Sequence, residues 1–291
     1  MMELYFSTGA FESQSPLKIY EECRELGVGM ELTSSFRPSK RLIEEVGELN
    51  VATGEVLVHN YFPPPETAFV LNLAATDLEI LEASKDHCRR AMELCAAIGA
   101  PFYSVHAGFA MNLRPAQLGQ PEQQAALGVE HLVPVEDARS VFRQSVLELA
   151  DHACKLNLRL LLENNVISPV QAAAGRAESL LLTHPEETRR FFEDLRHPAA
   201  GFLLDVAHAK VSGRALGFDP MAFFFELEEF LGALHLSDND GQRDNNQMFG
   251  PDAWFRNALK GLNGVPKVVE VYRLSCEQRR AQLAVLSDFV Q

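Results

Sequence analysis

Short apolar runs that each end in a histidine or a carboxylate recur along this chain, and this repetition constrains the fold more than any other feature. In one run, Phe202 to Leu204 lead into Asp205, with His208 three residues later. A short apolar run is typical of a strand that is buried on both faces of a parallel sheet. A carboxylate at the end of such a strand is costly unless it is hydrogen-bonded, paired or bound to a metal. We expect the strand to open into a loop here, with both polar residues as candidate metal ligands.

The apolar runs predict eight strands that alternate strictly with helical patterns. Strands that alternate with helices imply a parallel sheet, and eight such units in ~250–300 residues imply a closed (β/α)8 barrel, the TIM barrel of the α/β class. A doubly wound open sheet is the alternative, and it is disfavoured because no glycine-rich phosphate loop follows the first strand. The predicted strands are Glu3–Ser7, Gly29–Thr33, Glu55–Val58, Phe102–Val105, Leu158–Leu162, the run that reaches Asp205, Gly232–Leu234 and Lys267–Val269.

The composition is that of an ordinary globular chain. It has 291 residues, of which 47% are hydrophobic, and no Pro-, Gly- or Ser-rich linker divides it. We therefore predict a single domain over residues 1–291. No apolar stretch approaches the ~20 residues of a membrane span, and the N-terminus lacks the basic region and apolar core of a signal peptide. The five cysteines form no C-x-x-C pair, so we expect reduced thiols and a cytoplasmic protein.

The chain is acidic, with a formal net charge of −14. General affinity for nucleic acids relies on Lys and Arg that contact phosphate groups. The charge therefore disfavours a nucleic acid partner, although it does not exclude a local basic groove.

Six polar residues occupy the same place, the C-terminal end of a short apolar run. Because side chains alternate across a strand, the residues two positions earlier share the barrel-facing side with these six. Active sites of such barrels lie at this C-terminal face. Imidazoles and carboxylates that converge there need a partner, and zinc, manganese, iron or cobalt suits them better than calcium. The six are His59, His106, Glu163, Asp205, His235 and Glu270, and the earlier residues are Leu57, Ser104, Leu161, Leu203, Ala233 and Val268.

Each of these residues also has a simpler interpretation. A single histidine at a strand end is more often a hydrogen-bonded structural residue, and a single glutamate often binds backbone amides or an arginine. Six aligned cases make coincidence a poor explanation. The histidines without this alignment are interpreted as surface residues, and they are His87, His131, His152, His184 and His197.

A long segment without a confident helix follows the fourth predicted strand, from Gly108 to Pro134. A loop of this length in a compact domain is usually functional. We therefore predict that the segment covers the mouth of the barrel, with Phe109, Met111 and Leu113 as candidates for its apolar lining.

The strand ends and the residues after them form recognisable motifs. These are His59-Asn-Tyr-Phe-Pro-Pro, His106-Ala-Gly, Leu162-Glu163-Asn164, Leu204-Asp-Val-Ala-His208, His235-Leu-Ser-Asp-Asn-Asp-Gly-Gln-Arg-Asp244 and Glu270 in Val-Val-Glu-Val-Tyr. Together they resemble the xylose-isomerase-like TIM-barrel superfamily. That superfamily contains sugar and sugar-phosphate isomerases and epimerases beside the endonuclease IV enzymes, and the resemblance covers nearly the whole chain.

The resemblance implies roles for individual residues. In the isomerase and epimerase branch, one divalent metal is held by Glu, Asp, His and Glu, and the metal here is expected to be zinc, manganese or cobalt. The matching ligands are Glu163, Asp205, His235 and Glu270, and the resemblance implies that the two glutamates also act as catalytic base and acid. The residues expected to bind substrate are His208, Arg243, His59 and His106.

The nuclease branch implies additional metal ligands, which match His59, His106, His208 and Asp244. That branch also has a histidine two residues after its Asp, where this chain has Asn246. Because an amide oxygen is a weak ligand, a complete three-metal cluster is not implied. His59 and His106 leave a second metal open.

Our leading hypothesis is a divalent-metal-dependent isomerase or epimerase of a small sugar, sugar phosphate or hydroxy-carbonyl compound. Removal of a proton beside a carbonyl creates enediolate charge, which a metal Lewis acid offsets, while two carboxylates remove and return the proton. The alternatives are an endonuclease IV-like phosphodiesterase at abasic DNA sites and a non-catalytic carbohydrate-binding barrel. A small-molecule carbohydrate is the expected partner, no membrane partner is expected, and monomer and homo-oligomer are both open.

Overall fold

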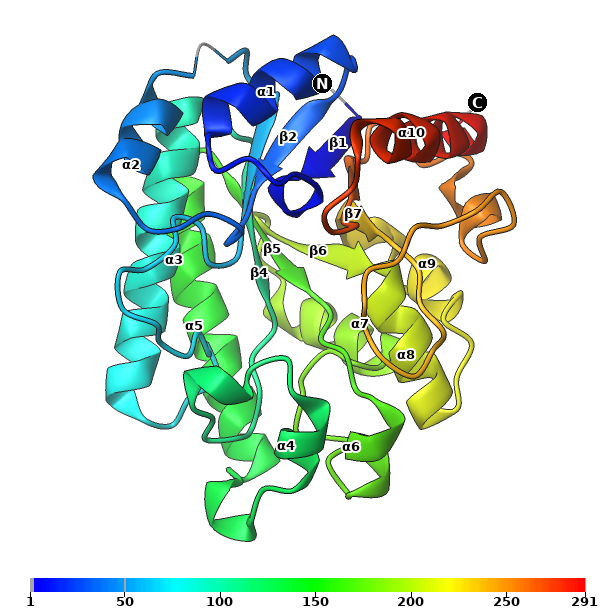
Figure 1. The fold of residues 1–291 in the computed structure, drawn as a ribbon. Helices are drawn as coiled ribbons and strands as arrows, with labels where there is room; N and C mark the ends of the chain where they lie inside the picture. Colours follow the sequence, from blue (N-terminus) through cyan, green and yellow to red (C-terminus); the bar gives the residue numbers. More distant parts are fainter. Residues whose placement is uncertain (1–2, 50, 291) are drawn as a thin grey trace.

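The strands form a closed parallel barrel, as predicted (Figure 1). The computed structural model describes residues 3–49 and 51–290. The strands are β1 Leu4–Ser7, β2 Gly29–Leu32, β3 Val56–His59, β4 Phe102–His106, β5 Arg159–Glu163, β6 Ala200–Asp205, β7 Leu231–Leu236 and β8 Lys267–Val269. Each strand pairs with the next along the chain, and β8 closes the barrel against β1. The predicted strands therefore agree with the observed ones apart from small differences at their ends.

Helices surround the barrel (Figure 1). Capping explains the ends of α3: the Oδ1 atom of Asp77 accepts the Glu79 N–H at 2.9 Å, and Gly99 ends the helix at a φ of 70°, which suits glycine. The α-helices are α1 Pro16–Glu25, α2 Lys40–Gly47, α3 Leu78–Ile98, α4 Pro121–Ala125, α5 Val135–Lys155, α6 Pro169–Ala173, α7 Pro185–Leu195, α8 Val206–Leu216, α9 Ala222–Glu226 and α10 Cys276–Val290. Short 3-10 helices are η1 Thr8–Ala10, η2 Pro115–Gln117, η3 Val129–His131, η4 Glu228–Phe230 and η5 Arg256–Leu259.

The inside of the barrel contains the predicted barrel-facing residues. Leu57, Leu161, Leu203, Ala233 and Val268 are buried in one apolar cluster with Tyr5 and Phe102. Burial of a leucine or valine side chain stabilises the fold by roughly 1.5–3 kcal/mol. Side chains two positions further along each strand point the same way, so this cluster forms the floor beneath the polar residues at the strand ends.

The chain does not open into a loop after Asp205, and that prediction is wrong. Asp205 is both the last residue of β6 and the N-cap of α8, because its Oδ1 atom accepts the His208 N–H at 2.7 Å. Gly213 lies inside α8, where a Cβ would meet the Phe218 carbonyl oxygen at 2.8 Å. His208 is therefore held on the first turn of a helix.

The segment from Gly108 to Pro134 packs differently from the predicted lining. Phe109, Met111 and Leu113 are buried in a separate apolar cluster that also includes Ile167 and Leu180. A hydrogen bond of 2.6 Å between the side chains of Gln171 and Gln124 joins α6 to α4 within this unit, which lies at the bottom of Figure 1. The hydrophobic effect explains the difference, because these apolar side chains are buried against one another and do not line the open mouth of the barrel.

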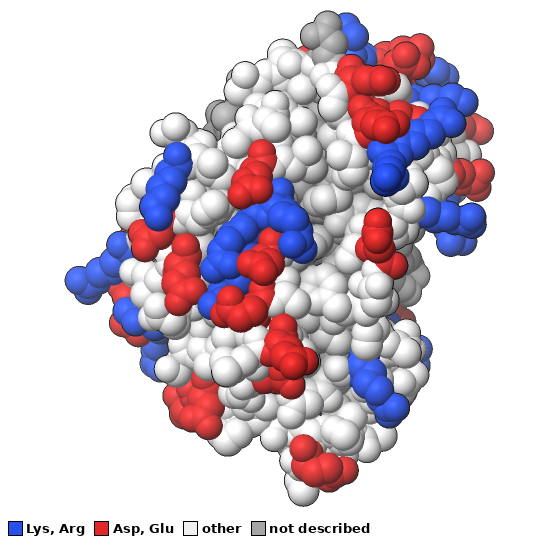
Figure 2. Space-filling model, turned by 90° about the vertical axis from the view of Figure 1, so that its left-hand side faces the viewer, with Lys and Arg blue, Asp and Glu red and all other residues white. Residues whose placement is uncertain are grey.

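Charged side chains on α3 and α5 form ion pairs on the outside of the molecule. Lys85 contacts Glu82 at 2.6 Å and Glu148 at 3.0 Å, and Arg89 contacts Asp86 at 2.6 Å. Figure 2 shows this side of the molecule, with basic and acidic groups next to one another. The exposed pair of Arg89 and Asp86 contributes about 0–1 kcal/mol, whereas the Lys85 side chain is largely buried between its two glutamates.

His87 is not a surface residue, and that prediction is wrong. Its side chain is buried, its Nε2 lies 3.1 Å from the Asn60 carbonyl oxygen, and its ring packs beside Tyr61 and Phe69. The cysteines are free thiols, as expected, and Cys154 and Cys276 are exposed. Within the described part of the chain, none of the helices has the length and apolar character that a membrane span requires.

Candidate metal centre

The C-terminal ends of six strands bring the predicted residues to one face of the barrel. The side chains are buried, except that of His106, which is 38% exposed. This placement follows from the parallel order of the strands, because all of their carboxyl ends lie on the same side. His59, His106, Glu163 and Asp205 are the last residues of β3, β4, β5 and β6, His235 lies one residue before the end of β7, and Glu270 directly follows β8.

Glu163, Asp205, His235 and Glu270 form one compact group. Each offers a ligand atom, and these atoms all lie within 4.8 Å of one another. The Nδ1 atom of His235 is 3.0 Å from Glu270 Oε2 and 3.7 Å from Glu163 Oε1. One imidazole nitrogen and three carboxylates thus converge from four strands of the barrel.

Several of these convergent atoms have no hydrogen bond although they are buried. They are both carboxylate oxygens of Glu163, Oδ2 of Asp205 and Nδ1 of His235. Leaving such atoms unpaired costs about 1–3 kcal/mol each, and more for charged groups. A divalent cation would satisfy all of them at once, and a set of nitrogen and oxygen donors fits zinc, manganese or cobalt. The residues therefore fit a metal ion of the predicted kind.

Imidazoles surround the Glu163 carboxylate. The Nε2 atoms of His59 and His106 lie 3.4 and 3.3 Å from its Oε2 atom. Burial alone would raise the pKa of Glu163, but the neighbouring His106, His235 and His59 hold the pKa well below its usual range. Burial lowers the pKa of His59 to about 3. Glu163 is therefore a carboxylate and His59 a neutral imidazole near neutral pH.

His59, His106 and Glu163 form a second group whose ligand atoms also lie within 4.8 Å of one another. The Nδ1 atom of His59 is 3.0 Å from the Ser104 hydroxyl, which leaves its Nε2 atom toward Glu163. The geometry is compatible with the second metal that the sequence left open, and occupancy of this group stays a prediction.

His208 and Asp244 form a pair beside the four-residue group. The Nδ1–H of His208 donates to the Asn164 carbonyl oxygen at 2.8 Å, and Nε2 is 3.1 Å from Asp244 Oδ2. Burial alone would lower the pKa of His208, but Asp205 and Asp244 hold the pKa well above its usual range. His208 is thus a charged hydrogen-bond donor rather than a free metal ligand in this arrangement.

Arg243 and Asn246 lie on the loop after β7 with different environments. The Arg243 side chain is 66% exposed and forms an ion pair with Glu122 of α4. Asn246 is buried, and its Nδ2 atom donates to the Glu270 carbonyl oxygen at 3.1 Å. The structure thus directs Arg243 toward α4, while Asn246 supports the backbone at Glu270.

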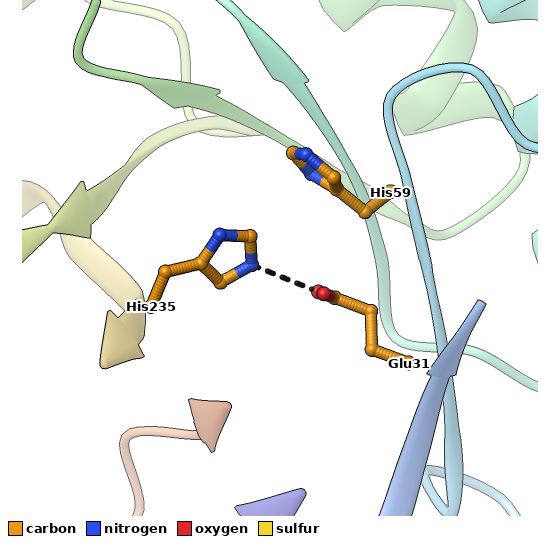
Figure 3. A group of neighbouring side chains, drawn as sticks. All are labelled: Glu31, His59 and His235. Atoms are coloured by element: carbon orange, nitrogen blue, oxygen red, sulfur yellow. Dashed lines mark hydrogen bonds and ion pairs between the residues drawn. The ribbon is translucent and has the colours of Figure 1, made fainter. Parts of the chain in front are cut away.

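Glu31 is fully buried in β2 and is not among the residues that the strand-end pattern selects. Its Oε1 atom accepts the Nε2–H of His235 at 3.1 Å (Figure 3). The signal was present, because a glutamate near the end of an otherwise apolar strand is seldom buried without a function.

A cavity of about 900 Å³ leads from the surface to the site. Its lining includes His59, His106 and Glu270, and both polar and apolar groups form its walls. Of the four residues predicted to bind substrate, His59 and His106 border this cavity, whereas His208 and Arg243 do not. The other lining residues are Gly9, Phe11, Glu12, Gln14, Thr33, Ser34, Ser35, Asn60, Tyr272 and Arg273.

Comparison with known proteins gives a consistent fold. A family model described as a xylose isomerase-like TIM barrel matches residues 20–286. A D-tagatose 3-epimerase-like protein is similar at a TM-score of 0.72 and 16% identity, with 99% of this chain and 97% of that chain covered. The 3-keto-D-glucoside 4-epimerase of E. coli is similar at a TM-score of 0.65 and 14% identity, with 99% of each chain covered. A Thermus thermophilus protein soaked with ZnCl2 is similar at a TM-score of 0.62 and 21% identity, with 98% of each chain covered.

No curated protein matches the sequence. At identities of 14–21%, the solved structures support the fold alone.

Proposed function

This chain belongs to the xylose isomerase-like TIM-barrel family, and we propose that it is a divalent-metal-dependent isomerase or epimerase of a small sugar, sugar phosphate or hydroxy-carbonyl compound. The observation that carries the proposal is the convergence of four buried ligand residues, with unsatisfied polar atoms, beside a cavity that Glu270 lines. The sugar epimerases among the similar structures point to the same class of substrate. When bound, the cation would supply Lewis-acid stabilisation of the negative charge that develops as a proton leaves carbon.

Two glutamates are available for proton transfer. Glu163 ends β5 and Glu270 follows β8, so the carboxylates approach the site from strands that are three positions apart in the barrel. Glu270 borders the cavity, whereas Glu163 is fully buried behind the histidines. We assign the first proton abstraction to Glu270 because it has direct access to the cavity. Glu270 would release this proton to solvent, and Glu163, which rests as a carboxylate, would take up a proton from solvent before it returns one to carbon.

Tyr272 helps to define the state of Glu270. Its hydroxyl group lies 3.4 Å from Glu270 Oε1. The Glu270 charge holds the pKa of Tyr272 well above its usual range, so the hydroxyl stays protonated and donates to the carboxylate. This hydrogen bond keeps one carboxylate oxygen oriented while the other, Oε2, faces His235.

The cavity walls suit a polyhydroxylated ligand. Gln14, Ser34, Ser35 and Asn60, which have hydroxyl or amide side chains, line the cavity together with Arg273. Such groups both donate and accept hydrogen bonds, as sugar hydroxyls require.

A panel of ketoses, aldoses and their phosphates tests the proposal, with protein loaded with Mn2+, Co2+ or Zn2+ and with product detected by NMR. Conversion of one sugar by the loaded protein, and its loss in Glu270→Gln, is the expected result. Glu45→Gln is the matched control, because Glu45 is also a buried carboxylate but lies on α2, hydrogen-bonded to Ser15. Binding of sugars without conversion of any of them would favour the non-catalytic barrel.

A phosphodiesterase remains the second candidate because His59, His106 and Glu163 could hold another metal. Two observations weigh against it. The chain has a formal net charge of −14, which disfavours general affinity for phosphate backbones, and Asn246 offers only a weak amide oxygen where the nuclease branch has a histidine. Cleavage of an oligonucleotide with an abasic site by the metal-loaded protein, with no sugar conversion, would overturn the isomerase proposal.

A further inference from the structure

A buried carboxylate that is not one of the four proposed ligands contacts one of them. We infer that Glu31 is a positioning residue, which fixes the His235 ring so that Nδ1 faces the metal and Nε2–H points away from it. The inference rests on the metal site of the proposed function. In Figure 3, Glu31 of β2 and His235 of β7 point toward one another across the mouth of the barrel.

The two ring nitrogens of His235 have different partners. Nε2 is 3.1 Å from Glu31 Oε1, whereas Nδ1 is 3.0 Å from Glu270 Oε2 and 3.7 Å from Glu163 Oε1. An imidazole that binds a metal through one nitrogen carries its proton on the other. A carboxylate that accepts this proton holds the ring in place and makes the ligand more basic. Glu31 is placed to do both.

Packing alone does not account for a glutamate at this position. Glu31 is fully buried, its Oε2 atom has no hydrogen bond, and within residues 3–49 and 51–290 its ion-pair partner is His235. A buried ion pair is often no more stabilising than apolar residues of the same volume. A glutamate at this place is therefore better explained by its effect on His235 than by the stability of the barrel.

Glu31 could also be a ligand of a different metal, since Glu31, His59 and His235 offer atoms within 4.8 Å of one another. A metal between Glu31, His59 and His235 would bind the lone pair of His235 Nε2. A metal in the group of Glu163, Asp205, His235 and Glu270 would bind the lone pair of Nδ1 instead. A neutral imidazole has one lone pair to offer while its other nitrogen keeps the proton. The two uses therefore exclude each other, and the larger set of unsatisfied atoms lies on the Nδ1 side.

Glu31→Gln tests the inference, because it keeps the size of the side chain and removes its charge. We expect Co2+ affinity, measured by competition with a chromophoric chelator, to fall about 10–100-fold. The visible spectrum of bound Co2+ should change as well. Glu45→Gln should bind Co2+ as the wild type does, and circular dichroism of the metal-free proteins should show that both variants are folded.

The outcomes separate this inference from the function on which it rests. Wild-type protein that binds no Co2+ rejects the metal site itself, and the positioning role with it. Wild-type protein that binds Co2+, with equal affinity and spectrum in Glu31→Gln, rejects the positioning role alone. Two equivalents in the wild type, with one lost in Glu31→Gln and the other unchanged, would make Glu31 a ligand and overturn the inference.

A second measurement does not depend on the variant. In zinc-loaded wild-type protein labelled with 15N on histidine, the His235 signals, assigned with His235→Ala, should show a proton on Nε2 and a metal on Nδ1. A metal on Nε2 would overturn the inference. This measurement decides the matter if Glu31→Gln does not fold.

Discussion

Asp205 combines two functions that a pair of substitutions can separate. Its Oδ1 atom caps α8 by accepting the His208 N–H at 2.7 Å, while its buried Oδ2 atom has no hydrogen bond and belongs to the proposed ligand group. Asp205→Asn keeps an oxygen for the cap but removes the charge, whereas Asp205→Ala removes both. Loss of an N-cap costs about 0.5–2 kcal/mol. Metal-free Asp205→Asn should therefore be more stable than metal-free Asp205→Ala by about that amount.

Metal binding should be impaired in both variants. At a Zn2+ concentration of 100 times Kd, binding adds about 2.7 kcal/mol to the free energy of unfolding of the wild type. A variant with a 100-fold higher Kd gains about 0.4 kcal/mol at the same concentration, by the same relation. Chemical denaturation with and without Zn2+ measures all of these quantities. If Asp205→Ala gained as much stability from Zn2+ as the wild type, the assignment of Asp205 as a ligand would be refuted.

Four further predictions concern the metal, the acid–base pair and the packing of the long segment. Purified protein should contain about one equivalent of divalent metal; elemental analysis that finds none, with no thermal stabilisation on adding zinc, manganese or cobalt, would count against the site. Glu163→Gln and Glu270→Gln should each lower turnover ~10²–10⁴-fold, and exchange of substrate protons with deuterated water should fall in parallel; unchanged exchange in both would reject the two-glutamate mechanism. Burial alone would lower the pKa of His235, but Glu31 and Glu270 hold the pKa well above its usual range in the metal-free protein, so the ring is protonated. Metal binding must release the proton of this imidazolium, and the affinity for the metal should therefore rise with pH. Calorimetry in buffers of different ionisation enthalpy measures the release, and a result of no released proton would contradict the prediction. Met111→Ala should lower the free energy of unfolding by about 2–5 kcal/mol because the side chain is buried. A denaturation curve identical to that of the wild type would show that the apolar cluster around Met111 is not a packed unit.

Local patterns predicted the barrel well because each strand carries its own signal. An apolar run with a polar residue at its end indicates where a buried strand stops. Side-chain alternation then assigned Leu161 and Leu203 to the interior of the barrel. The same reasoning failed at Asp205, since one residue both ends a strand and caps a helix, and no turn residues separate the two elements. It also failed at Met111, where burial depends on contacts with residues far along the chain, such as Ile167 and Leu180.

The candidate site was predictable to the extent that its residues end strands. Glu163 ends β5, Glu270 directly follows β8 and His235 lies one residue before the end of β7, so the parallel order of the strands brings all three to one face. Glu31 also lies one residue before a strand end, but the predicted strand continued to Thr33, which placed Glu31 inside it, and its partner His235 is 204 positions away in the sequence. Glu31 and His235 face one another because the barrel is closed. A pattern along the sequence does not show which distant residues come into contact.

Anomalous diffraction from crystals grown with Mn2+, Co2+ or Zn2+ tests directly whether Glu163, Asp205, His235 and Glu270 hold one divalent cation. We expect a strong anomalous peak between these four side chains, with Nδ1 of His235 as the nitrogen ligand. A second peak at His59 and His106 would add to the site without changing that claim. A strong peak elsewhere, with Glu163, Asp205, His235 and Glu270 left without a cation, would contradict it.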